Sequence, residues 1–352
     1  MMNSTTTQPR NLFGFWTDFW LTSGLSVLVI AGMLLTGYQI ETSNDGMPLI
    51  TTALLLQLLL NWPHFMVSYR LLYRQPDCFK RFPGATLIVP GILVLLIALI
   101  GSLANSTPEH VSLSLLLSYG FWLIASFYLA WHYVGQAWGC FSAFTLLSGH
   151  QWNTHEKRIL HWCFRSLILW HVVWAARFLP TVSWVDWLQH DTVYLLVSGL
   201  AFSGFVVSGC LLLPAWKKGQ IDVRTVGIGF SLFFWYLAIF LNPAAIFWVQ
   251  IAHSLQYLVF VTRVEANRPA PSHPKVSSST RIKLIYLGCV IAGAAVFYQA
   301  EMNANLQSAT PTLIGLLAIA INIHHYYVDS SIWKLRNEPT RALLFGHLKK
   351  SR

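Results

Sequence analysis

The chain has 352 residues, of which 55% are hydrophobic and only 10% are charged. A soluble domain carries about 25% charged residues, so this composition excludes a soluble globular fold and is typical of a polytopic membrane protein. The net charge of +10 has to be interpreted from where the charges lie, and it does not by itself indicate nucleic-acid binding. The five cysteines are odd in number and form no CxxC pair, which argues against a disulfide framework or a cysteine metal cage.

Ten hydrophobic runs along the chain are long enough to cross a bilayer, because a spanning helix needs about 20 apolar residues. We therefore predict an all-α, polytopic membrane helix bundle with ten transmembrane helices, forming a single domain over residues 1–352. The uncharged region 111–149 is predicted to hold one span followed by an interfacial or re-entrant helical piece over 134–148. The predicted spans are 20–40, 49–69, 85–103, 113–132, 158–178, 192–214, 225–241, 244–262, 284–300 and 312–333.

Lysine and arginine collect in alternate connections, as the positive-inside rule requires of cytoplasmic loops. Connections 70–84, 215–224 and 263–283 are basic, whereas the alternate connections hold no Lys or Arg, and all of them except 242–243 hold acidic residues. Both termini are therefore predicted to be cytoplasmic, with short tails over 1–15 and 334–352 and a cytoplasmic linker over 263–283. The excess positive charge is explained by this topology, and a bacterial-type cytoplasmic membrane is expected.

The predicted topology assigns a depth to each of the 13 histidines. Ionisable residues inside spans are costly, face the protein interior and are functional candidates by default. Five predicted spans carry an imidazole toward the cytoplasmic side, and neutral imidazoles that meet at one depth suit a divalent transition metal. A single imidazole is equally compatible with an interhelical hydrogen bond. The predicted metal-ligand candidates are His64, His132, His161, His253, His324, His325 and Asp329.

Spacing within these spans indicates which candidates share a helix face. His325 and Asp329 are four residues apart, which places them on one face, either as two ligands or as a ligand with its orienting carboxylate. His324 points about 100° away, so it either reaches a second metal or packs elsewhere. Nearby amides, a phenol and a carboxylate are expected to orient the imidazoles or to form ordinary polar contacts between helices. These supporting candidates are Asn61, Gln136, Gln256, Tyr257, Asn322 and Asp18.

Three further residues inside or beside spans have simpler interpretations. His171 lies in the middle of the fifth predicted span and is expected to be structural. Arg177 lies on the outer side against the charge rule, and we expect it to pair with Asp186 or Asp191. Pro63 precedes His64 and is expected to kink the second span, either opening the helix ladder near the cluster or serving packing alone.

The segment Asn322-Ile-His324-His325 resembles the HxxHH box of histidine-rich integral-membrane di-iron oxygenases and desaturases, with Asn322 in place of the first His and one residue instead of two before the His pair. No HxxxH box and no second HxxHH box accompany it. The chain is also similar in size, number of spans and dispersal of histidines over several helices to the bacterial integral-membrane carotene-cleaving dioxygenases of the Brp/Blh type. These resemblances imply a multi-histidine iron centre that activates dioxygen against an apolar substrate.

Two classes of function follow from these patterns. The first is a metal-dependent membrane oxidoreductase, an oxygenase or desaturase acting on a lipid or isoprenoid at the cytoplasmic leaflet. Its expected cofactor is iron, as one or two ions, with zinc, copper or haem as alternatives, and its expected partners are membrane lipids, a hydrophobic substrate and an electron donor. The second is a proton-coupled transporter with a histidine-lined pathway. Zinc-dependent hydrolysis fits less well, because only Asp329 and Asp18 could serve as its general base.

Overall fold

The computed structural model describes residues 10–36, 55–180, 184–269, 277–302, 313–335 and 337–349. The described chain is 86% helical and contains no strand, which confirms the predicted all-α fold. Its principal elements follow one another in the order α1 (Phe15–Phe19), η1 (Trp20–Gly24), α2 (Leu25–Leu35), η3 (Gln57–Asn61), α4 (Trp62–Tyr73), α5 (Cys78–Arg81), η4 (Gly84–Ile88), α6 (Val89–Ala104), α7 (Pro108–Leu147), α8 (Thr154–Ala176), α9 (Asp186–Gln189), α10 (Asp191–Lys217), α11 (Val223–Leu241), α12 (Ala245–Asn267), α13 (Ser278–Met302), α14 (Leu313–Ile332) and α15 (Glu338–Lys349).

Eight helical segments within the described residues are long and apolar enough to cross a membrane, as in a multi-pass membrane protein. They coincide with eight of the ten predicted spans. The other two predictions, 49–69 and 312–333, overlap η3 with α4 and α14, although residues 49–54 and 312 lie outside the described part. These helices carry His64 and His325, and such polar residues lower the mean hydropathy of the helices that hold them. The number of crossings and the side of the termini remain predictions.

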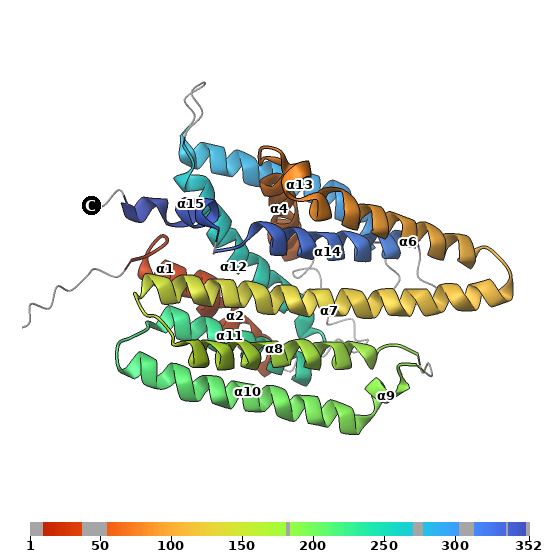
Figure 1. Ribbon diagram of the computed structural model, residues 1–352, viewed down its shortest axis with the longest axis horizontal. Coiled ribbons are helices and arrows are strands. Elements are labelled where there is room, and N and C mark those ends of the chain that lie inside the picture. The colour runs from red at the N-terminus through yellow and green to blue at the C-terminus, as the bar shows by residue number, and fades with distance from the viewer. Residues whose placement is uncertain are drawn as a thin grey trace, which may run out of the picture.

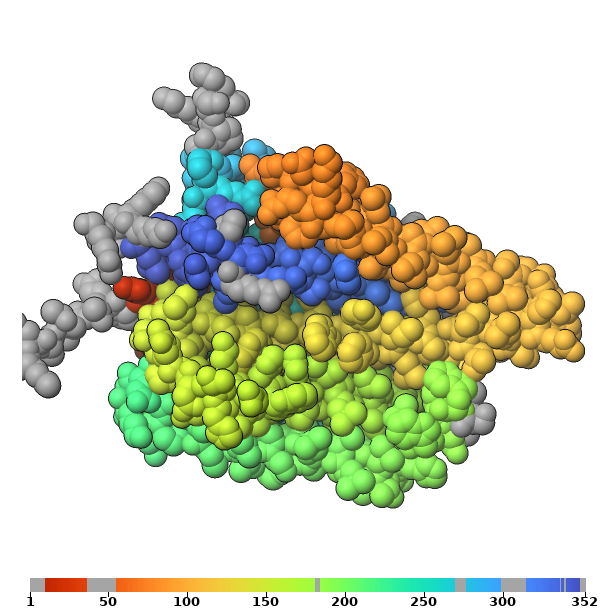
Figure 2. Space-filling model, in the orientation of Figure 1, coloured from red at the N-terminus to blue at the C-terminus, as the bar shows by residue number. Residues whose placement is uncertain are grey.

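The span and the following helical piece predicted for region 111–149 form one helix, α7, which runs without interruption for 40 residues. No proline follows its first turn, so nothing removes a backbone donor from its ladder. At about 1.5 Å per residue the helix is about 60 Å long, roughly twice the apolar thickness of a bilayer. Figures 1 and 2 show the hairpin of α6 and α7 projecting beyond the other helices.

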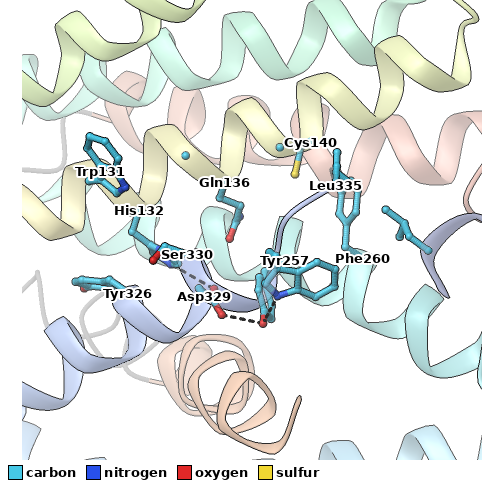
Figure 3. Close-up of a pocket in the computed structure, with 14 residues that line it drawn as sticks. Trp131, His132, Gln136, Cys140, Tyr257, Phe260, Tyr326, Asp329, Ser330 and Leu335 are labelled. Carbon is cyan, nitrogen blue, oxygen red and sulfur yellow. Dashed lines mark hydrogen bonds and ion pairs between the residues drawn. The ribbon is translucent and has the colours of Figure 1, made fainter. Parts of the chain in front are cut away.

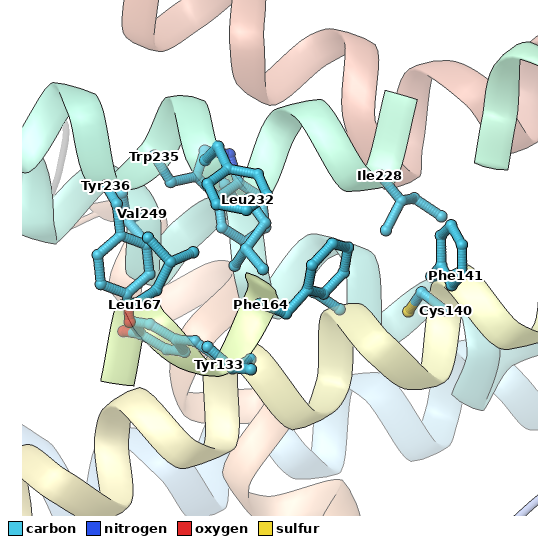
Figure 4. Packing of buried hydrophobic residues seen from close by; sticks show 14 of the residues in the cluster. Tyr133, Cys140, Phe141, Phe164, Leu167, Ile228, Leu232, Trp235, Tyr236 and Val249 are labelled. Carbon is cyan, nitrogen blue, oxygen red and sulfur yellow. The ribbon is translucent and has the colours of Figure 1, made fainter. Parts of the chain in front are cut away.

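Helices α7, α8 and α10 lie side by side, with α8 between the other two (Figure 1). Small residues allow this approach: a Cβ atom added at Gly204 of α10 would lie only 3.0 Å from the carbonyl oxygen of Cys163 on α8. Aromatic rings such as Phe164 fill the space between α7, α8 and α11 (Figure 4). The fully buried Trp235 of α11 donates from Nε1 to Ser26 Oγ of α2 at 3.0 Å. Close packing of this kind stabilises helices in a membrane, where the hydrophobic effect between them is absent.

A second group of helices, α4, α12, α13 and α14, packs beside this core. Here Gly293 brings α13 against α4, since a Cβ atom at that position would lie 2.6 Å from the Cβ atom of Trp62. Helix α14 also contacts α7, and α12 contacts α11, η1 and η3. The inner faces of α4, α7, α12 and α14 therefore meet, and these four helices carry the buried histidines discussed below.

The structure describes three predicted features at the ends of the helices. Arg177 pairs with Asp191 at 2.9 Å, one of the two partners expected for it. The predicted tail 334–352 contains the helix α15, which packs on the end of α12 through Asn267, whose Nδ2 donates to Leu343 O at 2.8 Å. The connection between α12 and α13 is shorter than the predicted linker 263–283, because α12 extends to Asn267 and α13 begins at Ser278.

Candidate metal centre

Four imidazole rings from four helices converge inside the bundle. His64 of α4, His132 of α7, His253 of α12 and His325 of α14 are all at most 6% exposed. The Nε2 atoms of His132 and His253 lie 2.9 Å apart, and those of His64 and His325 also lie 2.9 Å apart. Helices far apart in sequence therefore aim their imidazole nitrogens at one small volume.

A carboxylate completes this group. Asp329 follows His325 by one turn of α14, and its Oδ2 lies 3.9 Å from His325 Nε2 and 3.8 Å from His132 Nε2. One donor atom from each of His64, His132, His325 and Asp329 lies within 4.8 Å of the others. The arrangement is a buried set of three imidazoles and one carboxylate, with the His253 ring against His132, and such a set could hold a metal ion.

The local backbone beside His64 departs from a regular α-helix. The π-helical turn η3 ends at Asn61, and Pro63 lies in the first turn of α4. Pro63 has no N–H, so it leaves the carbonyl of Leu59 without its helical donor. The hydroxyl of Tyr286 on α13 donates to that carbonyl instead. A neighbouring helix thus stabilises the irregular turn, of a kind that occurs frequently at functional sites.

Asp329 is held in place by a hydrogen-bonded chain centred on Tyr257. The Tyr257 hydroxyl donates to Asp329 Oδ1 at 3.0 Å and accepts from Trp333 Nε1 at 2.7 Å. Ser68 Oγ lies 2.6 Å from the same hydroxyl, and the Tyr257 ring meets the His64 ring edge to face at 4.0 Å between centroids. The sequence analysis predicted Tyr257 but not Ser68 or Trp333. Each lies one helical turn after a cluster residue, a spacing from which both could have been found.

The predicted amides connect helices around His253. Gln136 Nε2 donates to the backbone oxygen of His253 at 2.8 Å and to Gln256 Oε1 at 3.1 Å. Gln256 Nε2 in turn donates to the backbone oxygen of Thr22 at 2.8 Å. These bonds link α7, α12 and η1, and they fix the backbone that carries the imidazole rather than the ring itself.

The other two predicted amides act within and between neighbouring helices. Ser254 Oγ donates to Asn61 Oδ1 at 2.7 Å, which connects η3 to α12 immediately beside His253. Asn322 accepts a hydrogen bond from the Tyr326 hydroxyl at 3.0 Å, and its Nδ2 donates to Ala318 O within α14. The hydrogen bonds of both amides go to hydroxyl or backbone groups, and none of them goes to an imidazole of the cluster.

Three predicted residues lie outside the cluster. His324 points away from His325, and its Nε2 lies 2.6 Å from the backbone oxygen of Ala85. His161 stacks on the Trp138 ring at 4.5 Å between centroids. Asp18 forms a buried ion pair with Arg224 at 3.2 Å and accepts backbone N–H bonds from the segment before α1, so its role is to anchor that segment.

Electrostatics favour a cation at the centre of the cluster. Asp329 is only 4% exposed, and among the described residues no lysine or arginine pairs with its carboxylate. The Nδ1 atoms of His64, His253 and His325 are also buried without a hydrogen-bond partner in the described part of the chain. Uncompensated buried carboxylates and polar atoms are costly. A metal cation that accepts Nε2 and carboxylate lone pairs would compensate the buried charge of Asp329, so the residues present fit a metal ion.

A cavity of about 250 Å³ adjoins the cluster and is lined by α7, α12, α14 and α15 and by the segment that connects the last two (Figure 3). His132 and Asp329 are part of its wall, and most of the remaining wall is aromatic, aliphatic or glycine. Glycines contribute open space along α7, because a Cβ atom added at Gly135 or Gly139 would contact nothing within 4 Å. The lining residues are Trp131, His132, Gly135, Gln136, Gly139, Cys140, Tyr257, Phe260, Tyr326, Asp329, Ser330, Trp333, Leu335 and Leu344.

Comparison of the chain with protein-family models, curated proteins and solved structures finds no match. The functional interpretation therefore depends on the buried cluster and its cavity. The structure shows a helical protein of multi-pass membrane type with a buried histidine and aspartate group that could hold a metal ion.

Proposed function

We propose that the protein is an integral-membrane, metal-dependent oxidoreductase that acts on an apolar lipid or isoprenoid substrate. The observation that carries this proposal is the position of the three-imidazole, one-carboxylate set at the wall of an apolar cavity. Donors of this kind suit iron, zinc or copper, and mixed imidazole and carboxylate sets with open positions are typical of non-haem iron oxygenases. Bound iron would supply the activation of dioxygen.

The residues of the chain have separate roles in this proposal. His64, His132, His325 and Asp329 would hold the ion, and His253 would either join them or orient His132. Tyr257 keeps the carboxylate of Asp329 directed at the cluster. Because the ligand carboxylate and its tyrosine are buried between helices, they need little reorganisation when a substrate enters.

The cavity is suited to binding an apolar chain. The faces of Trp131, Tyr326 and Phe260 offer broad contact area without charge, and the glycines of α7 leave room beside them. Such a wall excludes water from the reacting end of the substrate, which suppresses hydrolytic side reactions. Among the described residues, Asp329 is the only carboxylate that lines this cavity, and as a ligand it would not be free to act as a general base. Redox chemistry therefore fits the site better than metal-dependent hydrolysis.

One observation supports the alternative of a proton-coupled transporter. Polar side chains continue along α12 from His253: Ser254 bonds Asn61, and one turn earlier Gln250 accepts from Gln57 Nε2 at 2.8 Å. Buried histidines such as His253 occur in proton relays within membranes, and the polar groups on this face of α12 would line a path to it. Proton uptake into proteoliposomes in response to a pH gradient, lost in the Gln250→Leu variant, would favour this alternative over an oxidoreductase.

Oxygen consumption by detergent-purified protein tests the proposed function. The protein is reconstituted with ferrous iron, a chemical reductant and unsaturated lipid or isoprenoid extracts, and products are identified by mass spectrometry. We expect substrate-dependent oxygen uptake that is abolished in the His132→Ala and His325→Ala variants. His171→Ala is the matched control, because His171 is equally buried but lies outside the cluster. Equal oxygen uptake in the cluster variants and the wild type would contradict the proposal.

A further inference from the structure

Four arginines surround a single glutamate at one end of the second helix group. Arg70 of α4 lies 2.9 Å from the carboxylate of Glu265, and Arg74 and Arg268 each lie 3.5 Å from it. Arg281 of α13 donates to the backbone oxygens of Glu265 and Arg268 at 2.6 and 3.2 Å. We refer to Arg70, Arg74, Arg268 and Arg281 as the arginine cluster.

The positive charge of this cluster is only partly compensated. Four guanidinium groups face one carboxylate, so the local charge is +3. Burial and the neighbouring guanidinium groups of Arg74, Arg70 and Arg281 lower the pKa of Arg268, while Glu265 acts in the opposite direction. The arginines therefore repel one another, and an additional anion among them would relieve that repulsion.

Arg74 offers donors to such an anion. Its side chain is 42% exposed, and its Nη1 atom lies 3.5 Å from a Glu265 carboxylate oxygen without forming a hydrogen bond to it. Within the described residues the Arg74 side chain donates no hydrogen bond. Arg70 is 29% exposed and uses one NH group on Glu265. Exposed NH groups from two arginines one helical turn apart match the oxygens of a phosphate, which guanidinium groups bind in bidentate fashion.

The position of the cluster indicates where that phosphate would come from. Arg268 immediately follows one membrane-spanning candidate, Ala245–Asn267, and Arg281 lies in the first turn of the next, Ser278–Tyr298. A group at the ends of two spans lies at the level of lipid headgroups. Other basic residues, such as Lys217 at the end of α10 and Lys218 directly after it, are exposed and form no ion pair in the described part of the chain. The topology alone therefore does not require four arginines to converge.

We propose that the arginine cluster is a binding site for the phosphate group of an anionic lipid. The site is independent of the metal centre: Arg70 follows His64 by six residues, about 9 Å along the helix axis. Glu265 acts as an internal anion that holds the arginines together and competes with the lipid phosphate. The same chemistry would recognise free phosphate, which the experiment distinguishes.

Native mass spectrometry of the detergent-purified protein tests this proposal with three probes: phosphatidic acid, phosphatidylcholine and inorganic phosphate. We expect phosphatidic acid to bind at least about tenfold more tightly than phosphatidylcholine, since hydrogen bonds to charged groups account for such a factor. Tight binding of inorganic phosphate without a preference for the acidic lipid would support an anion site supplied from solution. Failure of both anions to bind would overturn the proposal.

Two substitutions make the test specific, because they act in opposite directions. Arg74→Gln removes exposed donors from a residue that packs little, and we expect about tenfold weaker binding of phosphatidic acid. Glu265→Gln removes the competing anion, and we expect tighter binding. Lys217→Gln on another basic connection is the matched control and should leave affinity unchanged. Equal effects of Arg74→Gln and Lys217→Gln, or weaker binding by Glu265→Gln in folded protein, would overturn the proposal.

Discussion

Replacing either of two buried aspartates by asparagine should change the stability of the metal-free protein, and in opposite directions. Asp18 is completely buried and pairs with Arg224 at 3.2 Å. Asp329 is also buried, but within the described residues it has no lysine or arginine partner. Asn has nearly the same shape as Asp and keeps an oxygen that accepts a hydrogen bond, so the Asp→Asn substitution at each position mainly removes the charge.

The magnitudes follow from these surroundings. Asp18→Asn removes one of the two carboxylates that pair with the buried Arg224, while Asp222 remains. Losing one such charged hydrogen bond should lower the free energy of unfolding by about 1.5–3 kcal/mol. Asp329→Asn removes an uncompensated carboxylate and retains an acceptor for the Tyr257 hydroxyl, so the metal-free protein should become more stable by about 1–3 kcal/mol. Saturating metal should stabilise the wild type by about 2.7 kcal/mol at one hundred times its Kd, and Asp329→Asn should lose most of that gain.

Thermal unfolding in detergent, followed by circular dichroism with and without chelator, measures these differences. The expected pattern is a higher Tm for chelated Asp329→Asn than for the chelated wild type, a lower Tm for Asp18→Asn, and a metal-dependent rise in Tm for the wild type and Asp18→Asn alone. If Asp329→Asn lowers the Tm of the chelated protein as Asp18→Asn does, the carboxylate is not uncompensated and the electrostatic argument for a metal fails.

Three further predictions concern the cavity, the ligand support and the irregular turn. Gly139→Leu should fill the cavity and reduce turnover of long substrates at least about tenfold while the metal content stays unchanged. Gly199→Leu, at an exposed position, should leave turnover unchanged. Product assays measure turnover and elemental analysis measures metal content; loss of metal in Gly139→Leu would contradict this account. Tyr257→Phe should weaken metal affinity about tenfold or more, measured by chelator competition; unchanged affinity would show that its hydrogen bond is dispensable. Tyr286→Phe should lower the free energy of unfolding by about 0.5–1.5 kcal/mol, and by less in a Pro63→Ala background that restores the backbone donor; equal losses in both backgrounds would refute the proposed role of the tyrosine.

The sequence predicts the core of the cluster because helical spacing and depth carry most of the information. His325 and Asp329 are one turn apart, and the structure places both at the same site. His132 and His253 share a depth with them in the predicted topology, and their Nε2 atoms meet. What depth does not specify is the direction in which a side chain points around its helix. His161 has a comparable predicted depth, yet its ring faces Trp138.

Other features depend on partners that are remote in sequence. Asp18 pairs with Arg224, more than two hundred residues later, and no local pattern indicates that pairing. Helix α7 is continuous because no proline interrupts it after its first turn. Its 40 residues are more than one bilayer crossing needs, so the criterion of span length does not predict a single helix. Site residues themselves obscure the span count, since the polar groups of α4 and α14 lower the hydropathy by which spans are recognised.

The central claim is that His64, His132, His325 and Asp329 bind a metal ion inside the membrane domain. Elemental analysis of detergent-purified protein tests it most directly, with the His132→Ala and His171→Ala variants measured in parallel. The account predicts at least one equivalent of a transition metal, with iron expected, in the wild type and in His171→Ala, and a loss of that metal in His132→Ala. Metal-free wild-type protein that also fails to take up iron, zinc or copper, or a metal content that is unchanged in His132→Ala, would contradict it.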